Sequence, residues 1–411
     1  MRGPPPAFAR DIVSARISLA VADRRFTLFG NLMLALAVVG YPLSAAVSQL
    51  MGAESNVINI AFRATILASS LLLGIWSLMR GQYRFDGLLL VFLTIYTVRM
   101  VLDLAYSGFP DIEDDFQFYV ATTLAPTLAL GAGHVWYEER TCARWIAGIG
   151  GFAGVLITYT LIFNPDTALL EALGDRAAFK FLNPISISYH GLYIAAAALI
   201  LIASPGGPRK ILIWGAVAGL GGYLLVAGGS RGPFVALVLA VGLTSIANTR
   251  TAGTYAILGI GVVVLLVAVG APELIVQRFL SAGDDASSLE RFNAIQLSLQ
   301  AAIDHPLLGY AYIEPITGNY PHNLLIEAAM ALGMVGAALM LWMEVSLIIS
   351  AWRLARRGEW LLPFLAATSF ANAWISGAIW GSGLFLAILW IARGRVRMLT
   401  SLQSRRAPRR T

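Results

Sequence analysis

Residues 322–352 read HNLLIEAAMALGMVGAALMLWMEVSLIISAW. The run is longer than the roughly 20 apolar residues needed to cross a bilayer, and its only acidic side chains are Glu327 and Glu344. Similar runs recur along the 411-residue chain, which is 58% hydrophobic and 13% charged, with a mean hydropathy of +0.72. A soluble domain carries roughly 25% charged residues. The sequence therefore predicts an integral membrane protein.

We expect an all-α integral membrane fold of about twelve transmembrane helices, with a large periplasmic loop between helices nine and ten. The expected spans are 26–50, 58–79, 86–106, 116–136, 143–164, 187–204, 210–227, 231–248, 254–271, 322–352, 360–377 and 380–394. They divide the chain into a cytoplasmic segment 1–25, helices one to nine in 26–271, a loop 272–321, helices ten to twelve in 322–394 and a basic cytoplasmic tail 395–411. The first span has no evident cleavage site after it, so we expect it to stay as an anchor.

The distribution of Lys and Arg predicts the orientation in the membrane. Most of the 29 basic residues fall before the first span, in every second loop, and in the tail. These residues are Arg2, Arg10, Arg16, Arg24 and Arg25 before the first span, Arg80 and Arg84, Arg140 and Arg144, Arg209 and Lys210, Arg250, Arg353 with Arg356 and Arg357, and seven arginines from Arg393 onward. Cytoplasmic loops carry this excess of positive charge. Both termini are therefore expected in the cytoplasm of a bacterial inner membrane protein.

The loop 272–321 is the longest of the chain, and we expect it to contain an amphipathic helix. Ser287 and Glu290 have the spacing of a capping box. Apolar residues then recur at helical intervals until Pro306 ends the pattern; they are Leu289, Phe292, Ile295, Leu299 and Ile303. The helix is expected to lie on the membrane surface or to pack over the spans.

Three polar residues near the outer ends of spans are candidates for chemistry. His322 begins span ten, where the helix dipole favours the neutral imidazole, which accepts a proton from a hydroxyl; it could instead cap the helix or belong to the core. Arg231, in a glycine-rich turn, could hold a phosphate bidentately or simply snorkel to water. Arg291 lies beside the apolar face of the loop helix, directed either toward the spans or, with Glu290, into solvent.

Other polar groups favour structural roles. Arg99 and Asp103 are four residues apart and are expected to pair along one helix. Glu327 is about 140° around the helix from His322 and could pair with an arginine elsewhere. The acidic stretch 111–115 could bind a divalent cation, although a solvated loop is the simpler reading. His134, His190 and His305 lack metal-ligand spacing, and the single cysteine, Cys142, excludes an internal disulfide. We expect no metal and no cofactor, and the position of the basic residues between spans argues against nucleic acid.

Several short motifs, taken in order, resemble the O-antigen ligase and O-antigen polymerase superfamily, which are bacterial membrane glycosyltransferases. Ser230-Arg231-Gly232 opens an apolar span. Glu290-Arg291-Phe292, followed by Asp304-His305-Pro306-Leu307-Leu308-Gly309-Tyr310, is similar to the family's "R…hPl.G.G" segment, with Ala311 in place of the second glycine. Pro321-His322-Asn323, with Glu327, Gly333 and Gly336, is similar to its "HN…LE…..G..G" segment. Asn183-Pro184 resembles a weaker "NPn" element.

The resemblance implies a polyprenyl-diphosphate-linked glycan donor, such as an undecaprenyl diphosphate glycan, and a metal-independent reaction that inverts the anomeric carbon at the periplasmic face. It implies that Arg231 and Arg291 engage the diphosphate and that His322 sits at the acceptor hydroxyl. Ser230, Asn183, Asn323 and Glu327 are the further substrate-binding candidates.

Three acceptors stay open. A growing glycan would make the protein an O-antigen or exopolysaccharide polymerase, which we prefer; a lipid A core would make it an O-antigen ligase in lipopolysaccharide biosynthesis; a protein acceptor comes third. The rival class is a multi-span transporter, but the polar groups gather at the outer interface rather than near the midplane. A structural scaffold would not need Arg231 and His322 at outer helix ends.

Overall fold

The computed structural model describes residues 7–52, 57–107, 109, 112–163, 177–180, 182–247 and 286–406, with the backbone alone for 7–23, 286–288 and 402–406. This part of the chain is helical, and its only β-type pairings are isolated bridges between Phe179 and Leu182 and between Glu314 and Asn319. The expected all-α class is therefore confirmed for the described residues.

The long helices correspond closely to the expected spans. They are α1 (Ala7–Leu50), α2 (Val57–Met79), α3 (Gly87–Tyr106), α7 (Glu139–Phe163), α9 (Pro184–Ala203), α10 (Pro208–Ala227), α11 (Arg231–Ala247), α15 (Leu324–Arg356), α16 (Leu361–Ile375) and α17 (Gly383–Arg406). Within the described residues, seven helices are long and apolar enough to cross a membrane, the first of them over Arg24–Leu50, while α11 and α16 are shorter apolar helices.

Four expectations differ from the structure or lie outside it. Helix α1 begins at Ala7, well before the expected start of the first span at residue 26. The span expected at 116–136 is broken into α4 (Ile112–Phe118), the π-helix η1 (Tyr119–Leu124), α5 (Ala125–Leu130) and α6 (Gly133–Trp136), where Pro126 removes a backbone donor. Helix α17 continues into the expected tail as far as Arg406, because residues 395–406 contain no proline or glycine to end it. The span at 254–271 lies outside the described residues, so the count of twelve remains a prediction.

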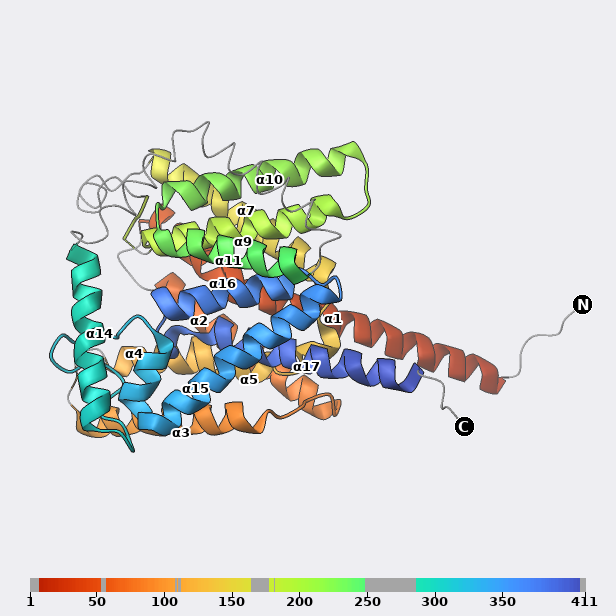
Figure 1. The fold of residues 1–411 in the computed structure, drawn as a ribbon. Helices are drawn as coiled ribbons and strands as arrows, with labels where there is room; N and C mark the ends of the chain where they lie inside the picture. Colours follow the sequence, from red (N-terminus) through yellow and green to blue (C-terminus); the bar gives the residue numbers. More distant parts are fainter. Residues whose placement is uncertain are drawn as a thin grey trace, which may run out of the picture.

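The long helices lie side by side, and one helix crosses their ends (Figure 1). Helix α14 (Ala286–Asp304) runs across one end of the bundle, beside the start of α15. The start of α1 and the end of α17 project from the opposite end. This arrangement agrees with two termini on one side and the loop helix on the other.

A kink in α15 joins the loop after α14 to the bundle. Gly333 has φ 66° inside α15, a left-handed conformation that favours glycine, and a Cβ there would lie 2.5 Å from the Pro306 carbonyl oxygen. Gly309, at φ 69°, packs in the same way against the Ala331 backbone. Two backbone hydrogen bonds join the loop to α15. The Tyr310 N–H donates to the Met330 carbonyl, and the Met334 N–H donates to the Pro306 carbonyl. Close backbone contact therefore requires glycine at both positions.

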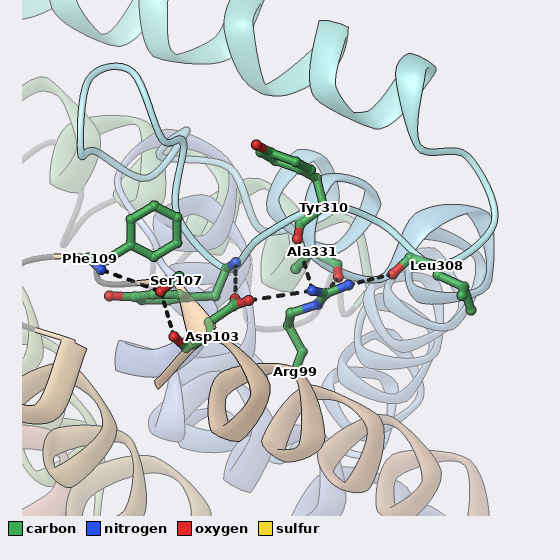
Figure 2. A network of polar contacts seen from close by, with 8 residues as sticks. Arg99, Asp103, Ser107, Phe109, Leu308, Tyr310 and Ala331 are labelled. Carbon is green, nitrogen blue, oxygen red and sulfur yellow. Dashed lines mark hydrogen bonds and ion pairs between the residues drawn. The ribbon is translucent and has the colours of Figure 1, made fainter. Parts of the chain in front are cut away.

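The Arg99 side chain, on α3, connects the kink in α15 to the loop after α14 through hydrogen bonds (Figure 2). Its guanidinium donates to three carbonyl oxygens, those of Ala331 at 2.9 Å, Tyr310 at 2.8 Å and Leu308 at 2.9 Å. It also lies 3.4 Å from Asp103, whose other carboxylate oxygen accepts the Tyr312 N–H at 2.9 Å. The expected structural role of the pair is confirmed, and it extends beyond one helix because Arg99 satisfies carbonyls that the kink and the loop leave without helical partners.

Candidate functional site

The C-terminal end of α16 is where several predicted site residues meet. Arg291 on α14 donates from Nη1 to the Ile375 carbonyl at 3.2 Å. Asn323 donates from Nδ2 to the Trp374 carbonyl at 3.4 Å, and His322 forms a hydrogen bond with the Ser376 backbone. The last carbonyls of a helix lack helical partners and carry partial negative charge. This end of α16 therefore anchors groups from two other helices.

His322 is held in an unusual backbone conformation between Pro321 and the start of α15. Its φ of 55° is the only positive value of a non-glycine residue in the described chain, and such left-handed residues cost energy and concentrate at functional sites. Asn323 caps α15 by accepting the N–H groups of Leu325 and Ile326, both at 3.1 Å. The cap fixes where the helix begins and so fixes the direction of the imidazole.

The imidazole is neutral near pH 7. Burial lowers the pKa of His322 to about 4, the positive charge of Arg291 lowers it further, and the bond to the Ser376 backbone opposes both. The neutral ring was expected from the helix dipole, and the structure assigns the larger causes to burial and to Arg291. Nδ1 is buried and has no hydrogen-bond partner among the described residues.

Arg291 points from α14 toward the bundle. It shares a helix face with Ala294 and Ser298, which are buried, whereas Glu290 is exposed. The reading of Arg291 as part of a solvated face with Glu290 is therefore wrong. The apolar stripe of α14 lies about a third of the way round the helix from this face.

That apolar stripe does not pack over the spans. Four of its five members are exposed, at 53% for Leu289, 56% for Phe292, 42% for Leu299 and 69% for Ile303, while Ile295 is half-buried. Helix α14 itself contacts α15, and the side chains that it buries are the small Ala294 and Ser298. The alternative position on the membrane surface stays a prediction.

Arg231 is the first residue of α11, directly after a tight turn. Gly229 has φ 54°, and the Ser230 N–H donates to Ser188 Oγ at 3.4 Å, which holds the turn against α9. A Cβ on Gly232 would lie 3.6 Å from Ile375 Cγ2 and 3.9 Å from Ser376 Oγ. The start of α11 therefore lies beside the same end of α16 that Arg291 and His322 contact.

Asn183 and Glu327 occupy structural positions. Asn183 Oδ1 accepts the Ser186 N–H at 2.8 Å and caps α9. Glu327 is fully buried, and its two carboxylate oxygens accept bonds from the Tyr96 hydroxyl at 2.8 Å and the Ile379 N–H at 2.9 Å. Neither geometry favours direct substrate contact. We interpret Glu327 as a structural residue of α15 whose hydrogen bonds connect this helix to α3 and to the segment after α16.

The sequence analysis missed the aromatic side chains around His322. The Tyr320 ring lies 4.3 Å from the His322 ring and meets the Trp380 ring edge-on at 5.9 Å. Burial raises the pKa of Tyr320, so its hydroxyl is a neutral donor. Tyr320 could have been found by its position two residues before His322, but no sequence signal marks Trp380 or the carbonyl end of α16.

The acidic stretch at 111–115 is only partly described. Asp115 accepts a bond from the Tyr312 hydroxyl at 3.0 Å. Across the described parts of the chain, no group of three or more His, Cys, Asp or Glu residues is placed to hold a metal ion. Arg291 brings a cationic group to the end of α16, and a guanidinium is suited to an anionic ligand.

Comparison with known proteins agrees with this geometry. The family model described as O-Antigen ligase matches residues 216–341. No curated protein matches the chain. The matched segment contains Arg291 and His322, which contact the end of α16, Arg231 at the start of α11, and both Gly309 and Gly333. The match over residues 216–341 supports membership of the chain in the O-antigen ligase and polymerase superfamily.

Proposed function

We propose that the protein transfers a glycan from a polyprenyl diphosphate to an acceptor hydroxyl at the periplasmic face of the bacterial inner membrane. The observation that carries the proposal is the convergence of Arg291, His322 and the start of α11 on the carbonyl end of α16. The proposed orientation, with both termini cytoplasmic, rests on the distribution of Lys and Arg.

The arginines would stabilise the leaving group. In the transfer, the acceptor oxygen forms a bond to the anomeric carbon while the bond from that carbon to the diphosphate oxygen breaks. Negative charge grows on the departing diphosphate, and preorganised donors stabilise it best. The planar forks of Arg231 and Arg291 match phosphate oxygens bidentately. Attack opposite the leaving group inverts the anomeric carbon, and two arginines supply the charge without a metal.

His322 would orient the acceptor and take its proton. A base with a pKa near 4 is weak, because proton transfer is most efficient when the pKa lies near the working pH. Diphosphate bound to Arg291 would offset the positive charge that lowers the pKa of His322. The donor would thus make the imidazole a stronger base at the moment when the acceptor hydroxyl loses its proton.

The acceptor is proposed to be a second lipid-linked glycan, which makes the protein an O-antigen or exopolysaccharide polymerase. Attachment to a lipid A core is the close alternative, because the residues around His322 form no motif that separates the two. A transporter is disfavoured by the family match and by a polar cluster at helix ends rather than at the midplane.

Two measurements test the proposal. Purified protein, given a polyprenyl diphosphate glycan and a second glycan, should release polyprenyl diphosphate and lengthen the product, also in excess EDTA. A strain lacking the protein should accumulate single repeat units. Free lipid-linked polymer in that strain would indicate the ligase instead, and no glycan change together with no transfer in vitro would refute the enzyme.

A further inference from the structure

A cavity of about 220 Å³ lies among α1, α2, η1 and the start of α17. Its lining is mostly apolar and consists of Leu36, Ala37, Tyr41, Phe62, Arg63, Ile66, Phe118, Thr122, Pro126, Leu130, Gly381, Gly383 and Leu384. Arg63 is the one charged residue of this lining. A single cation in a mostly apolar cavity needs a physical explanation, because the proposed transfer does not use it.

Arg63 belongs to a helix that can cross the membrane. Helix α2 begins at Val57, so Arg63 lies about 9 Å along the helix from its start, at 1.5 Å per residue. A charged side chain at such a depth is costly, and arginines found there face a cavity or an anionic partner.

The described structure provides Arg63 with an aromatic neighbour but no anion. The guanidinium carbon lies 4.8 Å from the centre of the Phe118 ring. Its Nε is buried without a hydrogen-bond partner among the described residues, and the ion pairs formed within those residues do not include Arg63. A guanidinium beside an aromatic face keeps its donor edge available for a phosphate.

Trp380 contacts both the cavity lining and the residues next to His322. The Trp380 ring meets Phe118 edge-on at 5.4 Å and Tyr320 edge-on at 5.9 Å, and Gly381, the next residue, lines the cavity. The indole Nε1 of Trp380 is also buried without a partner in the described part of the chain. The neighbouring η1 is a π-helix, a local distortion that is frequent at functional sites. A chain of contacts through Phe118, Trp380 and Tyr320 thus connects Arg63 to His322.

We propose that this cavity is a binding site for one phosphate-headed lipid. The phosphate would accept hydrogen bonds from Arg63, and the first part of the chain would lie against the apolar walls. The rest of the chain would follow the outer surface of α2, where Ile60, three residues before Arg63, is 59% exposed. The proposal concerns binding alone and does not depend on whether the protein transfers a glycan.

Native mass spectrometry of the full-length protein in detergent tests this directly. The probes are phosphatidylglycerol, a polyprenyl monophosphate and diacylglycerol, each added in a titration. We expect a one-to-one complex with a phosphate-headed lipid and none with diacylglycerol. Preference for phosphatidylglycerol would identify a bulk membrane lipid as the ligand, and preference for the polyprenyl monophosphate would identify a carrier lipid.

Variants locate the site. Arg63→Gln should weaken the complex by about tenfold or more, the effect of losing a hydrogen bond to a charged group, and Arg63→Lys should retain part of the affinity. The matched control is Arg80→Gln, near the other end of α2, where Arg80 lies over Phe26 and Trp76; it should bind as the unchanged protein does.

A cavity-filling variant keeps the test decisive if Arg63→Gln does not fold. Ala37→Phe leaves Arg63 in place but occupies the cavity, and it should also lose the bound lipid. The proposal would be overturned if Arg63→Gln or Ala37→Phe bound the lipid as well as the unchanged protein does. It would also be overturned if Arg80→Gln weakened binding as much as Arg63→Gln does.

Discussion

Replacing His322 with alanine should abolish glycan transfer while leaving donor binding intact. The imidazole lies against Tyr320 and bonds to the Ser376 backbone, whereas the diphosphate is assigned to the arginines. Loss of an acid–base or orienting group typically costs about 10²–10⁴-fold in rate. Arg291 keeps its bond to the Ile375 carbonyl in this variant, so the affinity for the donor should stay within about twofold.

The free energy of unfolding of His322→Ala depends on two features of residue 322, the left-handed backbone and the neutral charge of the imidazole at pH 7. At pH 7 the ring is neutral and contributes little packing, so His322→Ala should unfold within about 1 kcal/mol of the unchanged protein. Alanine at φ 55° keeps the left-handed strain, and His322→Gly should therefore be more stable than His322→Ala by about 1 kcal/mol.

The pH dependence gives a second measure of the environment of His322. Its pKa falls from 6.5 in the unfolded chain to about 4 in the folded protein, so the unfolded state binds the proton more tightly. The contribution to stability is complete above pH 6.5 and is lost as the pH falls toward 4. The full shift corresponds to roughly 3 kcal/mol. Because the ring is partly exposed, we expect about half of that, and His322→Ala should not show this loss.

The assay measures transfer per folded molecule together with donor binding and unfolding between pH 4 and 8. A structural histidine would behave in the opposite way, with lower stability or expression and normal activity in the folded fraction. Full specific activity of His322→Ala would remove histidine from the mechanism and leave a displacement stabilised by arginine alone.

Three further predictions concern the arginines and the topology. Arg231→Lys and Arg291→Lys should each lose most transfer while still inserting, because a point charge does not replace a bidentate fork; near-normal transfer in either would show that the fork is not needed. Arg99→Gln should lower the free energy of unfolding by about 2 kcal/mol, because three backbone carbonyls lose a charged donor, one in a part-buried bond and two in exposed bonds, and an unchanged unfolding midpoint in detergent would contradict this. Reporter fusions at Gly283 should read periplasmic and those after Arg397 cytoplasmic; the reverse would put the proposed site on the wrong side.

Much of the fold could be predicted because a bilayer imposes one length and one polarity on every span. The expected helix at 58–79 differs from α2 by one residue at its start. The span at 116–136 was harder, because its composition is apolar throughout and the break into η1 and α5 depends on local backbone geometry rather than on hydropathy. Pro126 was the one local signal of that break.

The candidate site could be predicted only in its charged members. Arg291 and His322 stand out because ionisable groups are rare near the ends of apolar runs. Their meeting point could not be inferred, because Trp374, Ile375 and Ser376 act through backbone groups that carry no sequence signal. Glu327 was expected to touch substrate, and only the structure reveals that Tyr96 and Ile379 occupy its carboxylate.

A double-mutant cycle on donor binding tests most directly whether Arg231 and Arg291 hold one diphosphate beside His322. Binding of a polyprenyl diphosphate glycan to the purified protein would be measured for Arg231→Gln, Arg291→Gln and the double variant, with Arg353→Gln at the far end of α15 as control. We predict that each single variant binds the donor about tenfold or more weakly and that the control binds as the unchanged protein does. The two effects should be coupled by about 0.5 kcal/mol or more, roughly the lower limit for groups that share a partner. Unchanged affinity in either single variant, or strictly additive losses, would contradict a shared diphosphate site.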